Sequence, residues 1–244
     1  SCSLVGSEMC IRDRDITVLS FSDSSMVDRN SSIIKVDSGW IVYSKNSESS
    51  ILSFTSDGQF SGYIGHRGNG PGEYTSVYDV VVNQKSKVLE VLSDGGIFCY
   101  TFGGDFLDKK EVTYPAFSFA IDDRQNYWFY VGNNTTYGDA KMICTDENIA
   151  NVAYYLHQKS NMLPMVENNF GRNGEWLTFH ESLNHDLYTI ENGKLDLSYA
   201  MDFPNYKLPK KLHELSGMEV IEELQRSNYA STVSYTHLTL PTIR

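Results

Sequence analysis

The sequence lacks the features of a membrane-spanning or nucleic-acid-binding protein. It contains no run of about 18 apolar residues, the length that a membrane-spanning helix needs, so we expect no transmembrane segment. Basic residues are too few to balance the acidic ones, because 20 Lys and Arg stand against 31 Asp and Glu, for a net charge of −11. A surface of this charge repels phosphate backbones, so we expect no nucleic-acid partner.

Cysteine is also scarce, with four residues in a chain of 244. Cys99 and Cys144 each lie in a short apolar segment, GIFCY and KMICT, which favours buried free thiols. The sequence leaves a disulfide between them open, since pairing depends on geometry. Neither cysteine has enough further ligand residues nearby to hold zinc.

The two ends of the chain differ from the rest. Met9–Asp13 (MCIRD) and Val233–His237 (VSYTH) can be encoded by one stretch of DNA read on opposite strands, and both resemble translated adapters from sequencing libraries. A signal peptide does not fit the first end, because charged residues interrupt its apolar stretch. We therefore expect residues 1–14 and 233–244 to be adapter-derived artefacts with few contacts to the core, and residues 15–232 to form the folded domain.

Short segments rich in aromatic and β-branched residues alternate with turn residues along the chain, as they do in antiparallel sheets. Three sets of four such segments span residues 33–65, 76–112 and 117–156. A fourth set begins at Glu175 and includes a hairpin turn at Asn192-Gly193. The sequence therefore predicts an all-β fold.

These sets also repeat in register. Asp57–Phe60 (DGQF) matches Gly103–Phe106 (GGDF) at a spacing of 46 residues, and Phe54 matches Tyr100 at the same spacing. Four strands in each period of about 40–50 residues are typical of a β-propeller, in which each unit forms one blade. A β-sandwich would need no such register. We therefore predict a partial β-propeller of about four blades over residues 15–232.

One segment breaks this pattern. Residues 208–230 carry apolar residues at every third or fourth position, which predicts an amphipathic helix, and Pro209 suits its first turn. We expect a helical insertion that covers a blade edge or the mouth of the channel. A plain packing helix fits the same pattern.

The glycine-rich stretch Gly65–Tyr74 (GHRGNGPGEY) raises the question of a phosphate loop. Such a loop needs a Lys-Ser or Lys-Thr pair and a following helix, whereas here Pro71 lies among the glycines and a strand-like segment follows. Glycines also let a chain turn where positive φ or close backbone approach is required. We therefore interpret the stretch as the link from the outer strand of one blade to the inner strand of the next.

The same stretch carries a family resemblance. The segment SDGQFSGYIGHRGNGPGEY resembles the blade junction of NHL-like six-bladed β-propeller proteins of the Bacteroidetes, in which DxxGxF leads to IGxxGxGPGEY. The matching positions are Asp57, Gly58, Phe60, Ile64, Gly65, Gly68, Gly70, Pro71, Gly72, Glu73 and Tyr74. The resemblance implies an exported protein, often a lipoprotein, in the periplasm or on the cell surface. It also implies six blades, so about four blades here would mean truncation at both ends, with a monomeric full-length protein and a self-associating fragment.

We expect a non-enzymatic binding module that holds an unknown protein or small ligand at the mouth of its channel and needs no cofactor. The candidate ligand-binding residues are Arg67, Glu73 and Tyr74, because an arginine can pair with a carboxylate and a tyrosine offers an apolar face with a hydroxyl. A structural role fits the same residues. In that role Glu73 would satisfy amides of the loop, and Tyr74 would wedge between blades.

The alternative is a metal-assisted hydrolase or lyase. The stretch from His180 to His185 (HESLNH) is one residue longer than the HExxH motif, so its histidines would not share one face of a helix. A turn between strands fits this stretch equally well. Together with Asp79, which lies on a candidate inner strand, these two histidines are the candidate ligands for Ca²⁺ or Zn²⁺.

Overall fold

The computed structural model describes residues 17–21, 31–45, 50–132, 140–150, 152–157, 168–174, 176–181, 184–207, 212, 214–215, 218–226, 230–231 and 242–243. These residues form four antiparallel sheets of four strands, in which each strand pairs with its neighbours along the chain. Sheet 1 consists of β1 (Ser32–Val36), β2 (Gly39–Tyr43), β3 (Ile51–Thr55) and β4 (Phe60–Ile64), and sheet 2 of β7 (Asp79–Asn83), β8 (Val88–Ser93), β9 (Gly96–Tyr100) and β10 (Phe106–Lys110). Sheet 3 consists of β11 (Ser118–Ile121), β12 (Tyr127–Tyr130), β13 (Ala140–Thr145) and β14 (Ala153–His157), and sheet 4 of β15 (Phe170–Asn173), β16 (Trp176–His180), β17 (Asp186–Glu191) and β18 (Lys194–Ala200).

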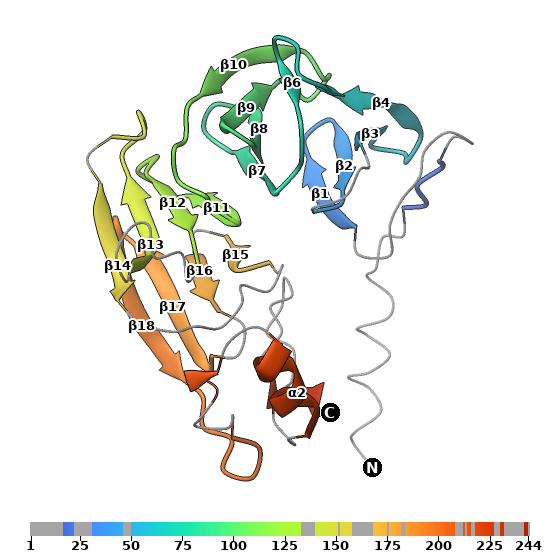
Figure 1. Ribbon diagram of the computed structural model, residues 1–244. Coiled ribbons are helices and arrows are strands. Elements are labelled where there is room, and N and C mark those ends of the chain that lie inside the picture. The colour runs from blue at the N-terminus through green and yellow to red at the C-terminus, as the bar shows by residue number, and fades with distance from the viewer. Residues whose placement is uncertain are drawn as a thin grey trace, which may run out of the picture.

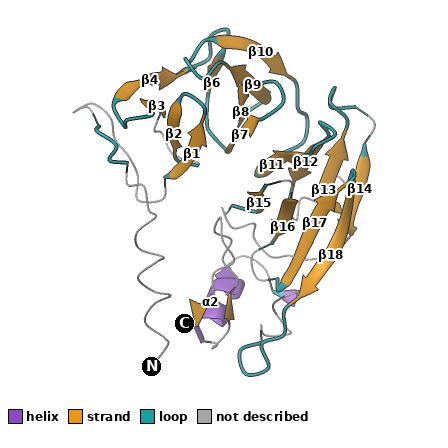
Figure 2. Cartoon of the chain, turned by 180° about the vertical axis from the view of Figure 1, so that it is seen from behind, coloured by secondary structure: helices purple, strands orange, loops and turns teal. Residues whose placement is uncertain are grey.

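The sheets are arranged as the blades of a propeller. Figures 1 and 2 show them following one another around an arc, with sheet 1 at one end of the arc and sheet 4 at the other. The first strand of each sheet lies toward the inside, and the inner strand β11 packs against both β7 and β15. The predicted all-β propeller arrangement with about four blades is confirmed.

The repeated register is visible in the turns between third and fourth strands. In the β3–β4 turn, Thr55 N donates a hydrogen bond to the carbonyl oxygen four residues later at 2.9 Å, and Gly58 adopts φ +89°. In the β9–β10 turn, Thr101 N makes the same bond at 2.9 Å, and Gly104 adopts φ +99°. Both pairs are 46 residues apart, so the two sheets are built from equivalent residues.

Apolar layers join neighbouring sheets. Side chains alternate between the two faces of a strand, so each inner face contributes every second residue to a layer. The layers contain Ile41, Ile51, Leu89 and Val91 between sheets 1 and 2, Leu92, Ile97, Phe119 and Phe129 between sheets 2 and 3, and Trp128, Met142, Phe179 and Ile190 between sheets 3 and 4. The far face of sheet 1 is covered by residues 17–21, where the rings of Phe21 and Phe54 meet edge to face at 5.0 Å.

Both cysteines of the sheets are buried free thiols, as predicted. Burial raises the pKa of Cys99 to about 12, and it raises the pKa of Cys144 to about 12 as well. Because the thiolate is the reactive form of cysteine, these two side chains serve as small apolar residues of the core.

Two elements differ from the sequence-based prediction. Sheet 4 has four strands, but its first strand, β15, lies before Glu175, where the predicted fourth set begins. Helix α2 covers Met218–Arg226, a shorter stretch than the predicted 208–230, and it buries Val220 against Leu212. In the described part of the chain no helix has the length and apolar character needed to cross a membrane.

The expected terminal segments fall almost entirely outside the described residues. Of 1–14 and 233–244, only Thr242–Ile243 is described. It forms strand β20, which pairs antiparallel with β19 (Ala230–Ser231). The prediction that these segments make few contacts with the core stays a prediction.

Residues 65–74 join sheet 1 to sheet 2, as the sequence predicts, and no helix follows them. Within this link β5 (His66–Arg67) and β6 (Glu73–Tyr74) pair in parallel. Gly65 adopts φ +61°, and its backbone lies against the ring of Tyr100, whose hydroxyl donates to Gly72 O at 2.9 Å. The link is therefore packed onto sheet 2.

Replacing Gly65 by alanine is expected to lower the free energy of unfolding by about 2–4 kcal/mol, measured by urea denaturation. Left-handed backbone alone costs about 1 kcal/mol for alanine, and overpacking adds about 1–3 kcal/mol. The new Cβ would lie 2.7 Å from the Tyr100 ring. Gly174 is the matched control, because it has the same φ of +61° but no atom within 4 Å of the added Cβ. Equal losses in the two variants would show that the Tyr100 ring moves aside without cost.

Candidate ligand-binding site

Each sheet has two ends with different connections. Because strands pair antiparallel in chain order, the turns from first to second strand and from third to fourth strand lie at the same end, called here the turn end. The turn from second to third strand and the links between sheets lie at the opposite end, called here the linker end.

Polar side chains fix the inner turns of sheets 2 and 3 at the turn end. Asn83 Oδ1 accepts hydrogen bonds from two amides of its own turn, each at 3.2 Å. Asp122 Oδ1 does the same in sheet 3, at 2.9 and 2.8 Å. Arg124 extends the network to sheet 4, since its Nη2 donates to Asn192 Oδ1 at 3.2 Å. Such bonds are typical of Asn and Asp in turns, and they shape this end of the molecule without a ligand.

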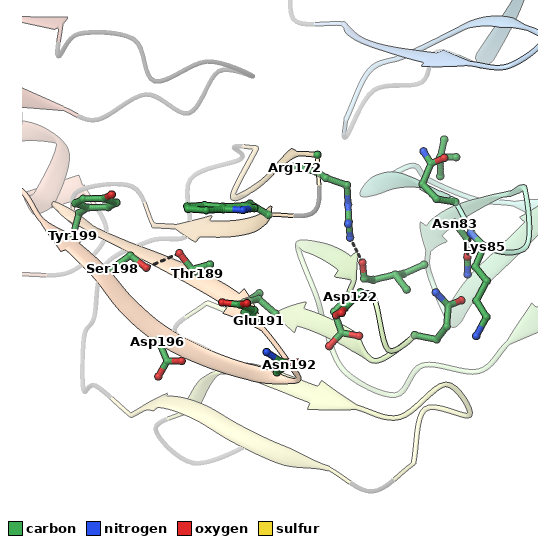
Figure 3. Close-up of a pocket in the computed structure, with 18 residues that line it drawn as sticks. Asn83, Lys85, Asp122, Arg172, Thr189, Glu191, Asn192, Asp196, Ser198 and Tyr199 are labelled. Carbon is green, nitrogen blue, oxygen red and sulfur yellow. Dashed lines mark hydrogen bonds between the residues drawn. The ribbon is translucent and has the colours of Figure 1, made fainter.

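These turns border a pocket of about 1000 Å³. Its walls come from the inner turns of sheets 2 and 3, the β15–β16 turn and the face of sheet 4 that points away from sheet 3. The lining residues are Val82, Asn83, Gln84, Lys85, Ile121, Asp122, Asp123, Gln125, Arg172, Gly174, Trp176, Thr189, Ile190, Glu191, Asn192, Asp196, Ser198 and Tyr199. Figure 3 shows Asn83 and Lys85 on one side, Tyr199, Ser198 and Thr189 on the other, and Arg172 between them.

Arg172 lies at the centre of the pocket wall. Its Nη2 donates to the carbonyl oxygen of Ile121, which anchors one edge of the guanidinium. Partial burial lowers the pKa of Arg172 from its ordinary value, and the carboxylates of Asp122 and Asp123 partly offset this shift. A guanidinium carries five N–H donors, so Arg172 can still donate hydrogen bonds into the pocket.

Several charged side chains of the pocket make no internal hydrogen bond or ion pair. Within the described part of the chain, Lys85, Asp123, Glu191 and Asp196 make no hydrogen bond or ion pair through their side chains. Each can therefore contact a bound molecule without first breaking an existing bond.

Two aromatic side chains complete the pocket. Trp176 is 65% exposed and Tyr199 is 60% exposed, although both are large apolar groups. A β-bulge shifts the β17–β18 register at Ser198, and both Ser198 and Tyr199 line the pocket as a result. One feature of the sequence indicates this site. Alternation along strand β16 places Trp176 on the face opposite the apolar Leu177 and Phe179, where a large aromatic side chain has no core to pack into.

The residues predicted to bind a ligand lie at the linker end, away from this pocket. Arg67 is exposed, and its Nε donates to Thr75 O at 2.8 Å. Glu73 Oε2 accepts a hydrogen bond from Gly70 N at 2.8 Å. Tyr74 is 1% exposed, and its hydroxyl donates to the last carbonyl oxygen of β4 at 3.2 Å. Glu73 and Tyr74 thus make the internal contacts of the structural role that the sequence also allows.

The residues predicted as metal ligands also lie at the linker end, each with contacts of its own. Asp79 forms an ion pair with Lys45 at 2.8 Å. His180 is buried, and its Nδ1 donates to Asn169 O at 3.3 Å, while His185 packs edge to face on an aromatic ring 4.8 Å away. Among the residues that the structure describes, no three His, Cys, Asp or Glu side chains gather closely enough to hold a metal ion.

Two buried ion pairs connect the sheets at the linker end. Asp79 of sheet 2 pairs with Lys45 of sheet 1 and accepts a hydrogen bond from Phe119 N of sheet 3 at 3.1 Å. Lys141 Nζ of sheet 3 lies 2.9 Å from both carboxylate oxygens of Glu181, which follows β16 of sheet 4. These pairs cross the apolar layers, so they fix how neighbouring sheets sit against each other.

His180 makes the stability of the protein depend on pH. Burial lowers the pKa of His180 below its ordinary value, and the contacts to Asn169 O and Glu181 offset this only in part. The unfolded chain therefore takes up a proton near pH 6.5 that the folded protein resists, and stability falls as pH drops below that value, with a slope of at most about 1.4 kcal/mol per pH unit. Thermal melts from pH 7.5 to 5.5 should show a steeper loss for wild type than for His180→Gln. Identical slopes for wild type and His180→Gln would contradict the assignment.

Four radially arranged sheets with a polar pocket at their turn end define a β-propeller. The sequence matches, over residues 13–239, the family described as Domain of unknown function (DUF4934), and the chain belongs to that family. Among curated proteins, none matches it significantly.

Two solved structures from Bacteroides share this fold. The first is described as an exported protein of Bacteroides fragilis, with a TM-score of 0.75, 15% identity, and coverage of 88% of this chain and 64% of that one. The second is a member of the DUF4221 family from Bacteroides vulgatus, with a TM-score of 0.50, 10% identity, and coverage of 78% and 62%. This chain therefore spans less than two thirds of either structure. The likeness supports the predicted propeller of Bacteroidetes type.

Proposed function

We propose that this protein is a non-enzymatic, extracytoplasmic binding module whose ligand site is the turn-end pocket. The proposal depends on one observation: turns of three sheets converge on a pocket of about 1000 Å³. Among the described residues, several of its charged side chains make no internal hydrogen bond or ion pair. Ligand sites are commonly concave and preformed, with a few polar groups that fix orientation. The exported Bacteroides fragilis relative supports a location in the periplasm or on the cell surface.

In the whole protein we place this module in a ring of six blades of the NHL-like type. We expect the whole protein to be a monomer, and a lipid anchor is common among proteins of this type. The glycine-rich link after sheet 1 and the greater length of the two solved relatives support this arrangement. Size-exclusion chromatography tests it. Residues 15–232 alone should self-associate, because exposed sheet faces and edges invite contacts, whereas the complete gene product should run as a monomer.

A thermal-shift screen with small polar metabolites tests the ligand site. A ligand at 100 times its Kd should stabilise the protein by about 2.7 kcal/mol. Arg172→Ala and Lys85→Ala should each weaken that stabilisation, while Arg67→Ala at the linker end should leave it unchanged. If Arg67→Ala weakened the stabilisation and Arg172→Ala and Lys85→Ala did not, the ligand site would lie at the linker end. Tightly bound, stoichiometric Ca²⁺ or Zn²⁺ in the purified protein would instead favour the metal-assisted hydrolase or lyase.

A further inference from the structure

The turn between the third and fourth strands of sheet 3 departs from the pattern of sheets 1 and 2. In those two sheets its left-handed position is a glycine with the preceding chain close against it. A Cβ on Gly58 would lie 2.1 Å from Val18 O, and one on Gly104 would lie 2.5 Å from Tyr63 O. In sheet 3 a hydrogen bond of 3.0 Å closes the same turn, but the left-handed position is Ile149, with φ +59°. Because a side chain fills this position, the chain of sheet 2 cannot pack there through its backbone.

A groove of about 370 Å³ opens between sheets 2 and 3 beside this turn. It is lined by β8 and β10 of sheet 2, by the start of β12 and by the β13–β14 turn, and it lies at the turn end. Ile149 is held in its unfavourable backbone conformation by packing against the layer between these two sheets. Strained residues of this kind gather at ligand sites. Both sheets of the groove are described, so neighbouring blades already enclose it.

A buried carboxylate lies at the bottom of the groove. Glu90 of β8 is only 1% exposed and stands on the apolar face of sheet 2 that meets sheet 3. The Tyr127 hydroxyl donates to its two oxygens at 3.0 and 2.8 Å, and Asn83 Nδ2 donates to Oε1 at 3.0 Å. Burial, with the charge of Glu90 second, raises the pKa of Tyr127 above its ordinary value, so this tyrosine stays a neutral donor. A charge in such a poorly solvated place attracts a cation strongly.

Lys110 shows that an ammonium group fits the groove. Its Nζ lies 3.8 Å from Glu90 Oε1, donates to the Tyr127 hydroxyl and stands 4.7 Å from the centroid of the Tyr127 ring. The ring therefore adds a cation–π contact to the ion pair. The side chain of Lys110 is 30% exposed and flexible, so its ammonium can move out to solvent. It is a tethered occupant that a bound cation can replace.

The lining of the groove carries more negative than positive charge. Its described residues include three carboxylates, those of Glu90, Asp108 and Glu147, and one ammonium, that of Lys110, for a sum of 1 − 3 = −2. Glu147 is exposed, and within the described part of the chain its carboxylate makes no hydrogen bond or ion pair. This balance favours a ligand with two positive charges and disfavours an anion.

We infer that the groove between sheets 2 and 3 binds a linear aliphatic diamine. One ammonium group of the ligand replaces that of Lys110 at Glu90, and the other pairs with Glu147. The apolar side chains of Val88 and Leu107 also line the groove and suit the methylenes between the two charges. A volume of about 370 Å³ is at the small end of the range for ligand sites, as expected for a molecule of this size. This second site goes beyond the proposed function, which concerns the turn-end pocket.

Isothermal titration calorimetry with cadaverine on the full chain tests the inference. Cadaverine should bind, and the neutral diol of the same chain length should not. Glu90→Gln should weaken the binding about tenfold or more and Glu147→Gln about threefold, because a buried pair contributes more than an exposed one. Lys110→Met should strengthen it, since this variant removes the competing ammonium. Asp57→Asn is the matched control, because this exposed carboxylate lies in the equivalent turn of sheet 1, and it should leave the affinity unchanged.

Each remaining outcome counts against the diamine site. No binding to either the wild type or Lys110→Met would overturn it, and so would equal binding of the diol. If Glu90→Gln does not fold, the exposed Glu147→Gln and Lys110→Met decide the question: affinities equal to that of the wild type in both would contradict the inference. Arg172→Ala changes the turn-end pocket and should leave cadaverine binding intact. Loss of binding in Arg172→Ala would move the diamine to that pocket.

Discussion

Replacing Lys141 by methionine is expected to lower the free energy of unfolding by about 3–5 kcal/mol, since removing one partner of a buried ion pair leaves the other charge uncompensated. The side chains of Lys141 and Glu181 are only 2% and 7% exposed. The Tyr130 hydroxyl also donates to Glu181, at 2.7 Å, but a neutral donor cannot replace the lost charge. Urea denaturation followed by tryptophan fluorescence measures the loss.

A double variant and a surface variant provide the controls. Lys141→Met combined with Glu181→Leu should recover most of the lost stability, because apolar side chains of similar volume can replace a buried ion pair at little cost. Lys207→Met should change stability little, since the Lys207–Asp202 pair is exposed. A double variant as unstable as the single one would show that packing around Glu181, and not its charge, carries the effect.

Replacing Asp79 by alanine is expected to cost about 3–5 kcal/mol as well, without any metal being involved. This carboxylate of sheet 2 contacts both neighbouring sheets: it pairs with Lys45 at 2.8 Å, accepts from the Tyr43 hydroxyl at 3.4 Å and accepts from Phe119 N at 3.1 Å. Burial, with the nearby Asp79 charge second, raises the pKa of Tyr43 well above its ordinary value, so this tyrosine stays a neutral donor. Thermal and urea denaturation measure the change.

The same experiment distinguishes a structural Asp79 from a metal ligand. EDTA should leave the melting temperature of the wild type unchanged, and added Ca²⁺ should not raise it. Asp123→Ala is the matched control. Asp123 is exposed at the turn end, so its replacement should lower the free energy of unfolding by at most about 0.5 kcal/mol. A large drop of the wild-type melting temperature in EDTA that Asp79→Ala abolishes would give Asp79 the role of a metal ligand.

The sequence predicts the sheets well because their determinants are local. Alternating apolar residues and turn residues define each hairpin, and the left-handed Gly58 and Gly104 mark the same turn in two sheets. Strand β15 was not predicted, because it has only four residues and two of them, Gly171 and Asn173, have low strand propensity. Helix α2 is shorter than the predicted helix of residues 208–230. The spacing of apolar residues shows which side chains can share one face of a helix, but it does not show where the helix begins.

The candidate site was harder to predict because its residues meet only after folding. Lys85 lies in the β7–β8 turn of sheet 2, whereas Arg172 and Tyr199 lie on two strands of sheet 4, and no short motif connects the three. Glu73 illustrates the opposite difficulty. A glutamate in a glycine-rich loop suits ligand binding by its chemistry, but only the structure shows its carboxylate accepting the Gly70 amide of its own loop.

Strand pairing in strict chain order has a consequence for synthesis. In the four described blades every hydrogen-bonded neighbour lies one hairpin away, so a blade can form from its own consecutive residues as soon as they leave the ribosome. Each new blade then finds the apolar face of the preceding one already in place. The order of translation and the order of assembly coincide, and the growing chain need expose only its most recent sheet face to the surrounding cell.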